Sequence, residues 1–282
     1  MSLGVRPLPK AIALALGDKP GPHDNLSLWL DKFLPRDPRD LSFTAEQRRA
    51  ALEPFEGART SPSARDALAR RAHHATQSPN RAGPWLLRST RGLLGRALPG
   101  GGAGGAMELS LGLDPRYGAP RLTGSALKGL ARTVAEADGW PTDKLELAFG
   151  RGVEDDPRPE PTALGGLICF LDALPENGQF QLVLDGLTPH MGPWYRGEAD
   201  APVEWLSPVP VSFLAVTNTT FVIDLMVWLP PEAPPDPNRR EESQRRKLIA
   251  LAEEAQRALL RGLEELGIGG KTAAGYGYFK EA

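Results

Sequence analysis

The chain of 282 residues has an ordinary globular composition, with 41% hydrophobic and 24% charged residues and a net charge of −2. This charge argues against a protein that binds polyanions over its whole surface, but it leaves room for a local basic groove. The single cysteine, Cys169, excludes an internal disulfide and a cysteine-rich zinc site. It lies in the apolar run 167–171, where we expect a buried structural thiol.

No stretch of the sequence is long and apolar enough to span a membrane. The apolar run at 11–16 is too short for the core of a signal peptide, and a turn sequence at 17–22 ends it at once. We therefore expect a cytoplasmic protein.

Residues 1–83 are expected to form a helical extension. The run 25–34 places its apolar side chains at helical spacing. Thr44, followed three residues later by Gln47, has the form of a capping box that opens a second helix. Pro62 suits the first turn of a third helix.

The most basic tract of the chain runs from Arg59 to Arg96, with eight arginines and one acidic residue. Arg88 and Arg91 of this tract fall in a predicted strand at 85–94. The imbalance favours a phosphate-contacting surface, but a solvated helix face explains it equally well.

A loop at 99–106 is almost pure glycine and is too poor in side chains to pack a core. After it, Thr123 or Ser125 is placed to cap a helix with apolar residues at helical spacing. Lys128 and Arg132 share a face near the start of this helix, where the helix dipole does not favour cations. An external anion at the exposed N–H groups would explain them, and ordinary surface charges are the alternative.

A proline-broken segment at 188–210 interleaves aromatic side chains with histidine and arginine, among them His190, Trp194 and Tyr195. Such a segment suits base stacking or a protein contact. Buried anchors of the loop are the alternative. A lone loop histidine could also act as an acid or base in RNA cleavage.

The chain ends in a glycine-rich loop that follows a long predicted helix and precedes a short closing strand. The central residues of the loop are Gly269, Gly270, Lys271 and Thr272. A loop so poor in side chains exposes backbone N–H groups and allows close approach, which favours contact with a phosphate. It is not a nucleotide P-loop, because Glu265 stands where that motif needs glycine and a helix precedes it where a strand is required. The histidines show no metal-ligand spacing, so we expect neither a metal nor a cofactor.

The predicted order of strand, helix, two strands, helix and strand is that of a ferredoxin-like (RRM-like) unit. We therefore expect an α+β fold over 84–282 with β-rich insertions. The segment Thr123-Gly-Ser-Ala-Leu-Lys-Gly129 and the glycine-rich loop resemble two motifs of the RAMP superfamily of CRISPR proteins. Within it, the segments 187–195 and 207–216 resemble the family of sixth RAMP subunits of type III-B (Cmr) effector complexes.

This resemblance implies a non-catalytic backbone subunit of an antiviral ribonucleoprotein, bound to CRISPR RNA near its 3′ end and to other Cmr-complex RAMP subunits. The capped helix, with Ser125, Lys128 and Arg132, and the glycine-rich loop would lie against guide-RNA phosphates. The insertion at 174–212 would be a thumb that props the duplex of guide and target RNA.

Two other functions remain open at this point. One is a RAMP endoribonuclease that processes precursor CRISPR RNA through His190 and a tyrosine such as Tyr195 or Tyr276. The other is a metabolic enzyme whose C-terminal loop holds a small phosphorylated ligand.

Overall fold

A computed structural model describes the chain at 16–17, 19–34, 43–76, 83–100, 109–153, 163–189, 191–198, 200–201, 208, 210–229 and 240–282. Its centre is an antiparallel sheet in the order β12-β1-β11-β7, and β8 also pairs with β11. The strands are β1 (Gly83–Leu94), β7 (Ile168–Phe170), β8 (Leu174–Pro175), β11 (Thr220–Leu229) and β12 (Tyr278–Glu281).

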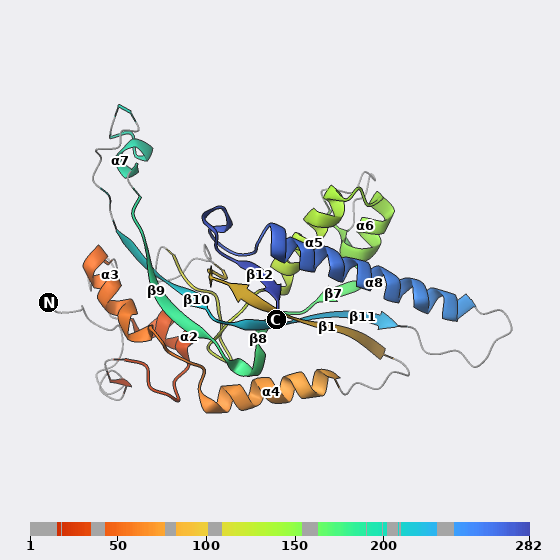
Figure 1. Cartoon of the computed structure of the whole chain (residues 1–282), viewed down its shortest axis with the longest axis horizontal. Helices are drawn as coiled ribbons and strands as arrows, with labels where there is room; N and C mark the ends of the chain where they lie inside the picture. The colour runs from red at the N-terminus through yellow and green to blue at the C-terminus, as the bar shows by residue number, and fades with distance from the viewer. Residues whose placement is uncertain are drawn as a thin grey trace.

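Two helices, α5 (Gly124–Ala137) and α8 (Arg240–Glu265), lie side by side on one face of this sheet (Figure 1). Alternate side chains of β11, namely Phe221, Ile223 and Leu225, are fully buried beneath them. In chain order the unit is β1-α5-β7-β11-α8-β12, and its strands take the sheet order of a ferredoxin-like fold. The predicted α+β, ferredoxin-like class is confirmed.

Short elements connect α5 to β7 and follow β8. They are α6 (Thr142–Phe149), β5 (Gly150–Arg151), β6 (Leu164–Gly165) and η3 (Glu176–Gly178), while β3 (Leu113–Asp114) and β4 (Ala119–Pro120) form a small ribbon before α5. Among the helices of the described ranges, none is long and apolar enough to cross a membrane.

Between β8 and β11 the chain leaves the central sheet as a long hairpin (Figure 1). The hairpin consists of β9 (Gln181–Leu187) and β10 (Val211–Thr217), with the short helix α7 (Gly192–Tyr195) at its far end. Strand β2 (Arg96–Ala97), which follows β1 after one residue, pairs with β10. The base of the hairpin is therefore joined to the end of β1.

The helices of the first 76 residues share one core with the sheet. They are α2 (Leu26–Leu28), η1 (Trp29–Phe33), α3 (Ala45–Leu52), η2 (Glu53–Phe55) and α4 (Pro62–Thr76). Trp29 and Phe55 are buried in the same apolar cluster as the residues under α5 and α8. The capping box of Thr44 and Gln47 and the start of a helix at Pro62 are both confirmed.

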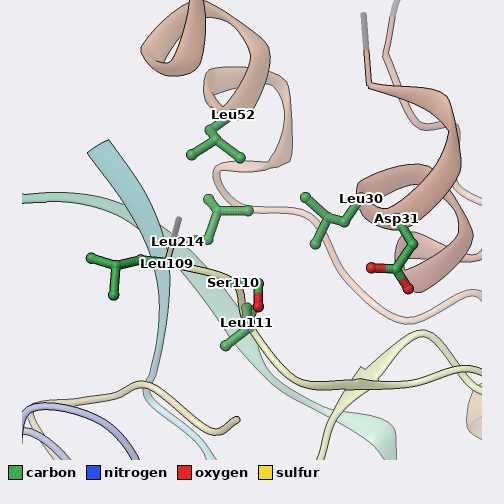
Figure 2. Close-up of a pocket in the computed structure, with 7 residues that line it drawn as sticks. All are labelled: Leu30, Asp31, Leu52, Leu109, Ser110, Leu111 and Leu214. Carbon is green, nitrogen blue, oxygen red and sulfur yellow. The ribbon is translucent and has the colours of Figure 1, made fainter. Parts of the chain in front are cut away.

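A small cavity marks the place where these helices meet the hairpin. Figure 2 shows Leu30 and Asp31 of η1, Leu52 of α3 and Leu214 of β10 around it, together with the segment 109–111. Its volume is about 20 Å³, which is room for about one water molecule. The cavity is a packing gap and is too small for a substrate.

Cys169 is exposed, so the prediction of a buried thiol is wrong. The residue lies in the three-residue strand β7, where Ile168 and Phe170 point into the core. Because side chains alternate along a strand, the residue between them points outwards.

The glycines of α5 provide a test of this packing. A Cβ atom at Gly124 would lie 2.0 Å from the carbonyl oxygen of Phe170, whereas one at Gly129 would meet nothing within 4 Å. We expect Gly124→Ala to lower the free energy of unfolding by about 1–3 kcal/mol, because α5 must move away from β7. Gly129→Ala should raise it by about 0.5–1 kcal/mol, since alanine is the better helix former.

Urea denaturation of the two variants measures both changes. No loss of stability in Gly124→Ala would contradict the described contact between α5 and β7, and a loss in Gly129→Ala would contradict the open space at that position.

Candidate nucleic-acid interface

The two segments predicted to contact phosphates lie at the same end of the central sheet. Tyr278, the first residue of β12, pairs with Leu94, the last residue of β1, so the glycine-rich loop lies at the end of β1. Leu122, just before α5, forms a bridge with Ala173, and the adjacent strand β8 pairs with the first residues of β11. Since β11 begins where β1 ends, α5 also begins at this end of the sheet.

The N-terminus of α5 is capped from within the chain. Thr123 is the N-cap residue, and its side chain accepts a hydrogen bond from the N–H of Ala126 at 3.3 Å. The N–H of Gly124 donates to a carboxylate oxygen of Asp172 at 2.8 Å, and Arg121 pairs with the other oxygen of that carboxylate at 3.2 Å. The predicted external anion is therefore not needed at the Gly124 N–H, because Asp172 already occupies that place.

The predicted site residues of α5 differ in their exposure and in whether they have an ion-pair partner. Ser125 and Gly129 are exposed, one turn apart. Arg132 pairs with Glu136 on the next turn, with 2.7 Å between Nε and Oε1. Lys128 has no ion-pair partner among the residues that the structure describes. Of the two predicted cations of α5, Lys128 is therefore the one left for an external anion.

The glycine-rich loop closes on its own backbone. The N–H of Ile268 donates to the carbonyl of Gly277, and the N–H of Gly270 donates to that of Leu98, both at 2.9 Å. A Cβ atom added at Gly277 would lie 2.0 Å from the carbonyl oxygen of Ile268, and one added at Gly269 would lie 2.7 Å from that of Leu98. These glycines are required by the packing of the loop and do not by themselves indicate a ligand.

The outer side of the loop carries Lys271 and Thr272, both half-buried. Lys271 has a left-handed backbone with φ of +65°, a conformation that costs a residue with a side chain about 1–2 kcal/mol. Such strain is often found at functional positions. The ammonium group stands 5.8 Å from the ring centroid of Phe213 and 6.0 Å from that of Tyr276. Within the described part of the chain it has no carboxylate partner.

A carboxylate joins this loop to the hairpin. Asp185 of β9 accepts a hydrogen bond from the hydroxyl of Tyr276 and pairs with Arg96 of β2 at 2.5 Å. Burial raises the pKa of Asp185, but hydrogen bonds from Tyr276, the Gly186 N–H and Arg96 outweigh it, so the pKa lies below its ordinary value. Burial and Asp185 raise the pKa of Tyr276, which keeps its hydroxyl protonated near neutral pH.

Arg96, Asp185 and Phe213 of this contact are not among the predicted site residues. They lie on three different strands, and only the register of β9 against β10 sets Asp185 opposite Phe213. No local pattern signals such a contact.

The two predicted arginines of β1 lie on opposite faces of the central sheet. Arg88 makes a bidentate pair with Asp224 at 2.8 and 2.7 Å, on the face away from α5 and α8. Arg91 lies under α8, where its Nε is 3.7 Å from Glu264. Both have carboxylate partners, so the tract does not present these two arginines as one basic surface.

The aromatic side chains of α7 are exposed at the far end of the hairpin. Trp194 is 40% exposed and Tyr195 is 83% exposed. The alternative of buried loop anchors is therefore wrong for these two residues. His190 lies outside the described residues.

Within the described ranges, no group of histidine, cysteine, aspartate and glutamate side chains is arranged to hold a metal ion. What the geometry offers is two lysines without ion-pair partners in the described residues, on two segments at one end of the sheet, a paired Arg96 near one of them, and exposed aromatics on an extended hairpin. This combination suits contact with a phosphate backbone and with unstacked bases.

Part of the sequence is similar to that of a known protein. An alignment over 124 positions, which covers 41% of this chain, gives 30% identity to "CRISPR system Cmr subunit Cmr6" of Pyrococcus furiosus. The match spans 31% of that relative, so this chain covers about a third of its length.

Solved structures share the fold. A chain of the type III-B Cmr-beta complex bound to cognate target RNA superposes with a TM-score of 0.57 and 18% identity, over 83% of this chain and 70% of that one. The crystal structure of Cmr6 from Pyrococcus furiosus gives a TM-score of 0.39 and 20% identity over 71% and 99% of the two chains, a similarity too low to support an argument. The sequence profile of the RAMP superfamily matches residues 93–280, which is more than half of the chain. The chain belongs to the RAMP superfamily.

Proposed function

We propose that the protein is a non-catalytic, RNA-binding backbone subunit of a type III-B CRISPR effector complex in antiviral defence. It would contact CRISPR RNA near its 3′ end, the target RNA paired with it, and other RAMP subunits of the Cmr complex. The same role would place it in the cytoplasm. The observation that carries the proposal is the pair Lys128 and Lys271, which lack ion-pair partners in the described residues and lie on two segments at one end of the sheet.

The phosphate contacts are assigned to the exposed side of α5 and to the outer side of the glycine-rich loop. On α5, Ser125 offers a hydroxyl and Lys128 a cation, with Arg132 beside them. The exposed Gly129 has open space where a side chain would stand, so an RNA backbone can approach the helix closely at this point. On the loop, Lys271 is the cation, and Gly269, Gly270 and Thr272 line the same turn.

The hairpin is assigned to the guide–target duplex. We propose the division into an extension at 1–83, a RAMP domain at 84–282 and a thumb at 174–212. The exposed aromatics of α7, together with His190, would contact bases or the neighbouring subunit. Arg88 and Arg91 are the weakest members of the predicted set, because RNA would have to compete with Asp224 and Glu264 for them.

No observation in the described residues favours the endoribonuclease. Of its predicted catalysts, Tyr276 donates its hydroxyl to Asp185 and has a raised pKa, which makes it a poor base near neutral pH. Two pockets among the described residues lie at α3 and α4 and include no residue of the glycine-rich loop, so neither favours a small phosphorylated ligand at that loop.

The direct test is purification of the tagged protein from its host under mild conditions. We expect guide RNA and further RAMP subunits to be recovered with it. Recovery of the bare chain, without RNA or RAMP partners, would overturn the proposed function.

Lys128→Ala and Lys271→Ala should each weaken binding to single-stranded RNA by about fivefold near 0.1 M salt. Each removes one phosphate contact and one released counterion, so the slope of log K against log salt should fall by about 0.7. The loss should be the same for unrelated RNA sequences, because phosphate contacts carry no base information. Fluorescence anisotropy over a series of salt concentrations measures both quantities.

Lys247→Ala is the matched control, since Lys247 is an exposed lysine of α8 and its removal makes the same change in net charge. An equal loss of affinity in the control would show that the overall charge is responsible. A change of sequence preference in either test variant would contradict the assignment to phosphates.

Tyr195→Ala should leave the free energy of unfolding unchanged, because the side chain is 83% exposed. It should weaken the affinity of the assembled complex for target RNA by up to about 1–3 kcal/mol, the value of one stacked base. Tyr195→Phe keeps the ring and should retain the affinity. Equal dissociation constants for wild type and Tyr195→Ala would exclude a stacking role for this residue.

A further inference from the structure

Five side chains from four segments meet where the hairpin joins the glycine-rich loop. They are Arg96, Asp185, Phe213, Lys271 and Tyr276. Asp185 and Phe213 are direct partners across β9 and β10, so their side chains lie on the same face of this ribbon. The carboxylate of Asp185 and the ring of Phe213 together form a platform, and the other three side chains contact one or both of them.

Asp185 is the more buried member of its pair with Arg96. Its side chain is 13% exposed, against 47% for Arg96. The contact with Asp185 uses one nitrogen of the guanidinium, Nη1, and a guanidinium has five N–H donors in all. Arg96 is thus anchored at one edge and retains donors for a second anion, in the planar arrangement that matches phosphate oxygens.

Lys271 lies against the same platform. Its ammonium group is close to the rings of both Phe213 and Tyr276, and these rings lie 6.1 Å apart. The Tyr276 ring is in turn fixed by the hydrogen bond from its hydroxyl to Asp185. The two cations come from β2 and from the C-terminal loop, and one carboxylate fixes the surroundings of both.

We propose that Arg96 and Lys271 form one binding site for the phosphodiester backbone of single-stranded RNA, with Asp185 as the positioning residue. This inference rests on the RNA-binding function proposed above. It adds Arg96 to the interface and makes the phosphate site depend on the hairpin, because Asp185 belongs to β9. RNA bound at the loop and the orientation of the hairpin are then coupled through a single carboxylate.

Asp185→Asn separates positioning from charge. If only net charge governs binding, removal of a carboxylate beside two cations strengthens the interaction with RNA. If Asp185 positions Arg96 and Tyr276, its loss weakens the interaction although the protein becomes more positive. We expect the weaker binding, by about threefold to tenfold near 0.1 M salt.

The experiment uses the full chain and a short, fluorescently labelled single-stranded RNA, with the dissociation constant measured over a series of salt concentrations. Arg96→Ala should weaken binding by about fivefold near 0.1 M salt and lower the slope against log salt by about 0.7, as one lost phosphate contact requires. Arg261→Ala and Asp138→Asn are matched controls. That pair also has 2.5 Å between its atoms and a 43% exposed arginine, but it lies at the C-terminal end of α5.

Tyr276→Phe is the second variant, in case Asp185→Asn lowers stability. It keeps the aromatic ring and the pair of Arg96 with Asp185 and removes only the hydroxyl bond to the carboxylate. We expect a smaller loss of affinity than for Asp185→Asn, with the salt slope unchanged because both cations remain. Urea denaturation of each variant confirms that the folded protein is compared.

The possible outcomes are distinct. If the wild-type chain binds no RNA, either alone or in the assembled complex, the proposed function fails and this inference fails with it. If the wild type binds but Arg96→Ala behaves like Arg261→Ala, only the inference is overturned. Stronger RNA binding by Asp185→Asn would be consistent with Arg96 and Lys271 as phosphate contacts, but it would overturn the positioning role of the carboxylate.

Discussion

The fold depends on backbone packed directly against backbone at glycine positions. Gly124 brings α5 onto the carbonyl of Phe170, and Gly277 brings the C-terminal loop onto that of Ile268. In each case a Cβ atom would lie 2.0 Å from an oxygen, which no side-chain adjustment relieves, because the obstructing atom is itself backbone. These contacts hold the start of α5 and the loop before β12 close to the sheet. The lysines of both segments are thereby held at one end of the central sheet.

This constraint changes the meaning of the glycine motifs that stand out in the sequence. The sequence predicts a loop whose backbone N–H groups are exposed to a phosphate, but Gly269 and Gly277 serve the internal closure of the loop. The order of elements, the cap at Thr123 and the ferredoxin-like class were predictable, because local periodicity and capping determine them. The role of Asp172 at the helix N-terminus was not, since that contact joins residues 48 positions apart.

Charge pairing explains how a chain with a net charge of −2 can present a basic site. Its described arginines are largely neutralised nearby: Arg88 by Asp224, Arg91 by Glu264 and Arg132 by Glu136. Composition and spacing cannot reveal this, because the partners of Arg88 and Arg91 come from β11 and α8. Lys128 and Lys271 have no ion-pair partner among the residues that the structure describes, and the positions of such cations matter more than the total charge.

Under the proposed function, two or three phosphate contacts would also limit what the chain can do alone. With a slope of about 0.7 per phosphate on single strands, such a site binds RNA weakly at physiological salt and loses most of its affinity when the salt is raised. A backbone subunit avoids this limit, because neighbouring subunits bound to the same RNA hold it at a high effective concentration near each site. In the proposed function the sparse cationic surface is an advantage, since it would let the chain bind RNA in the assembly while the free chain would stay off unrelated RNA.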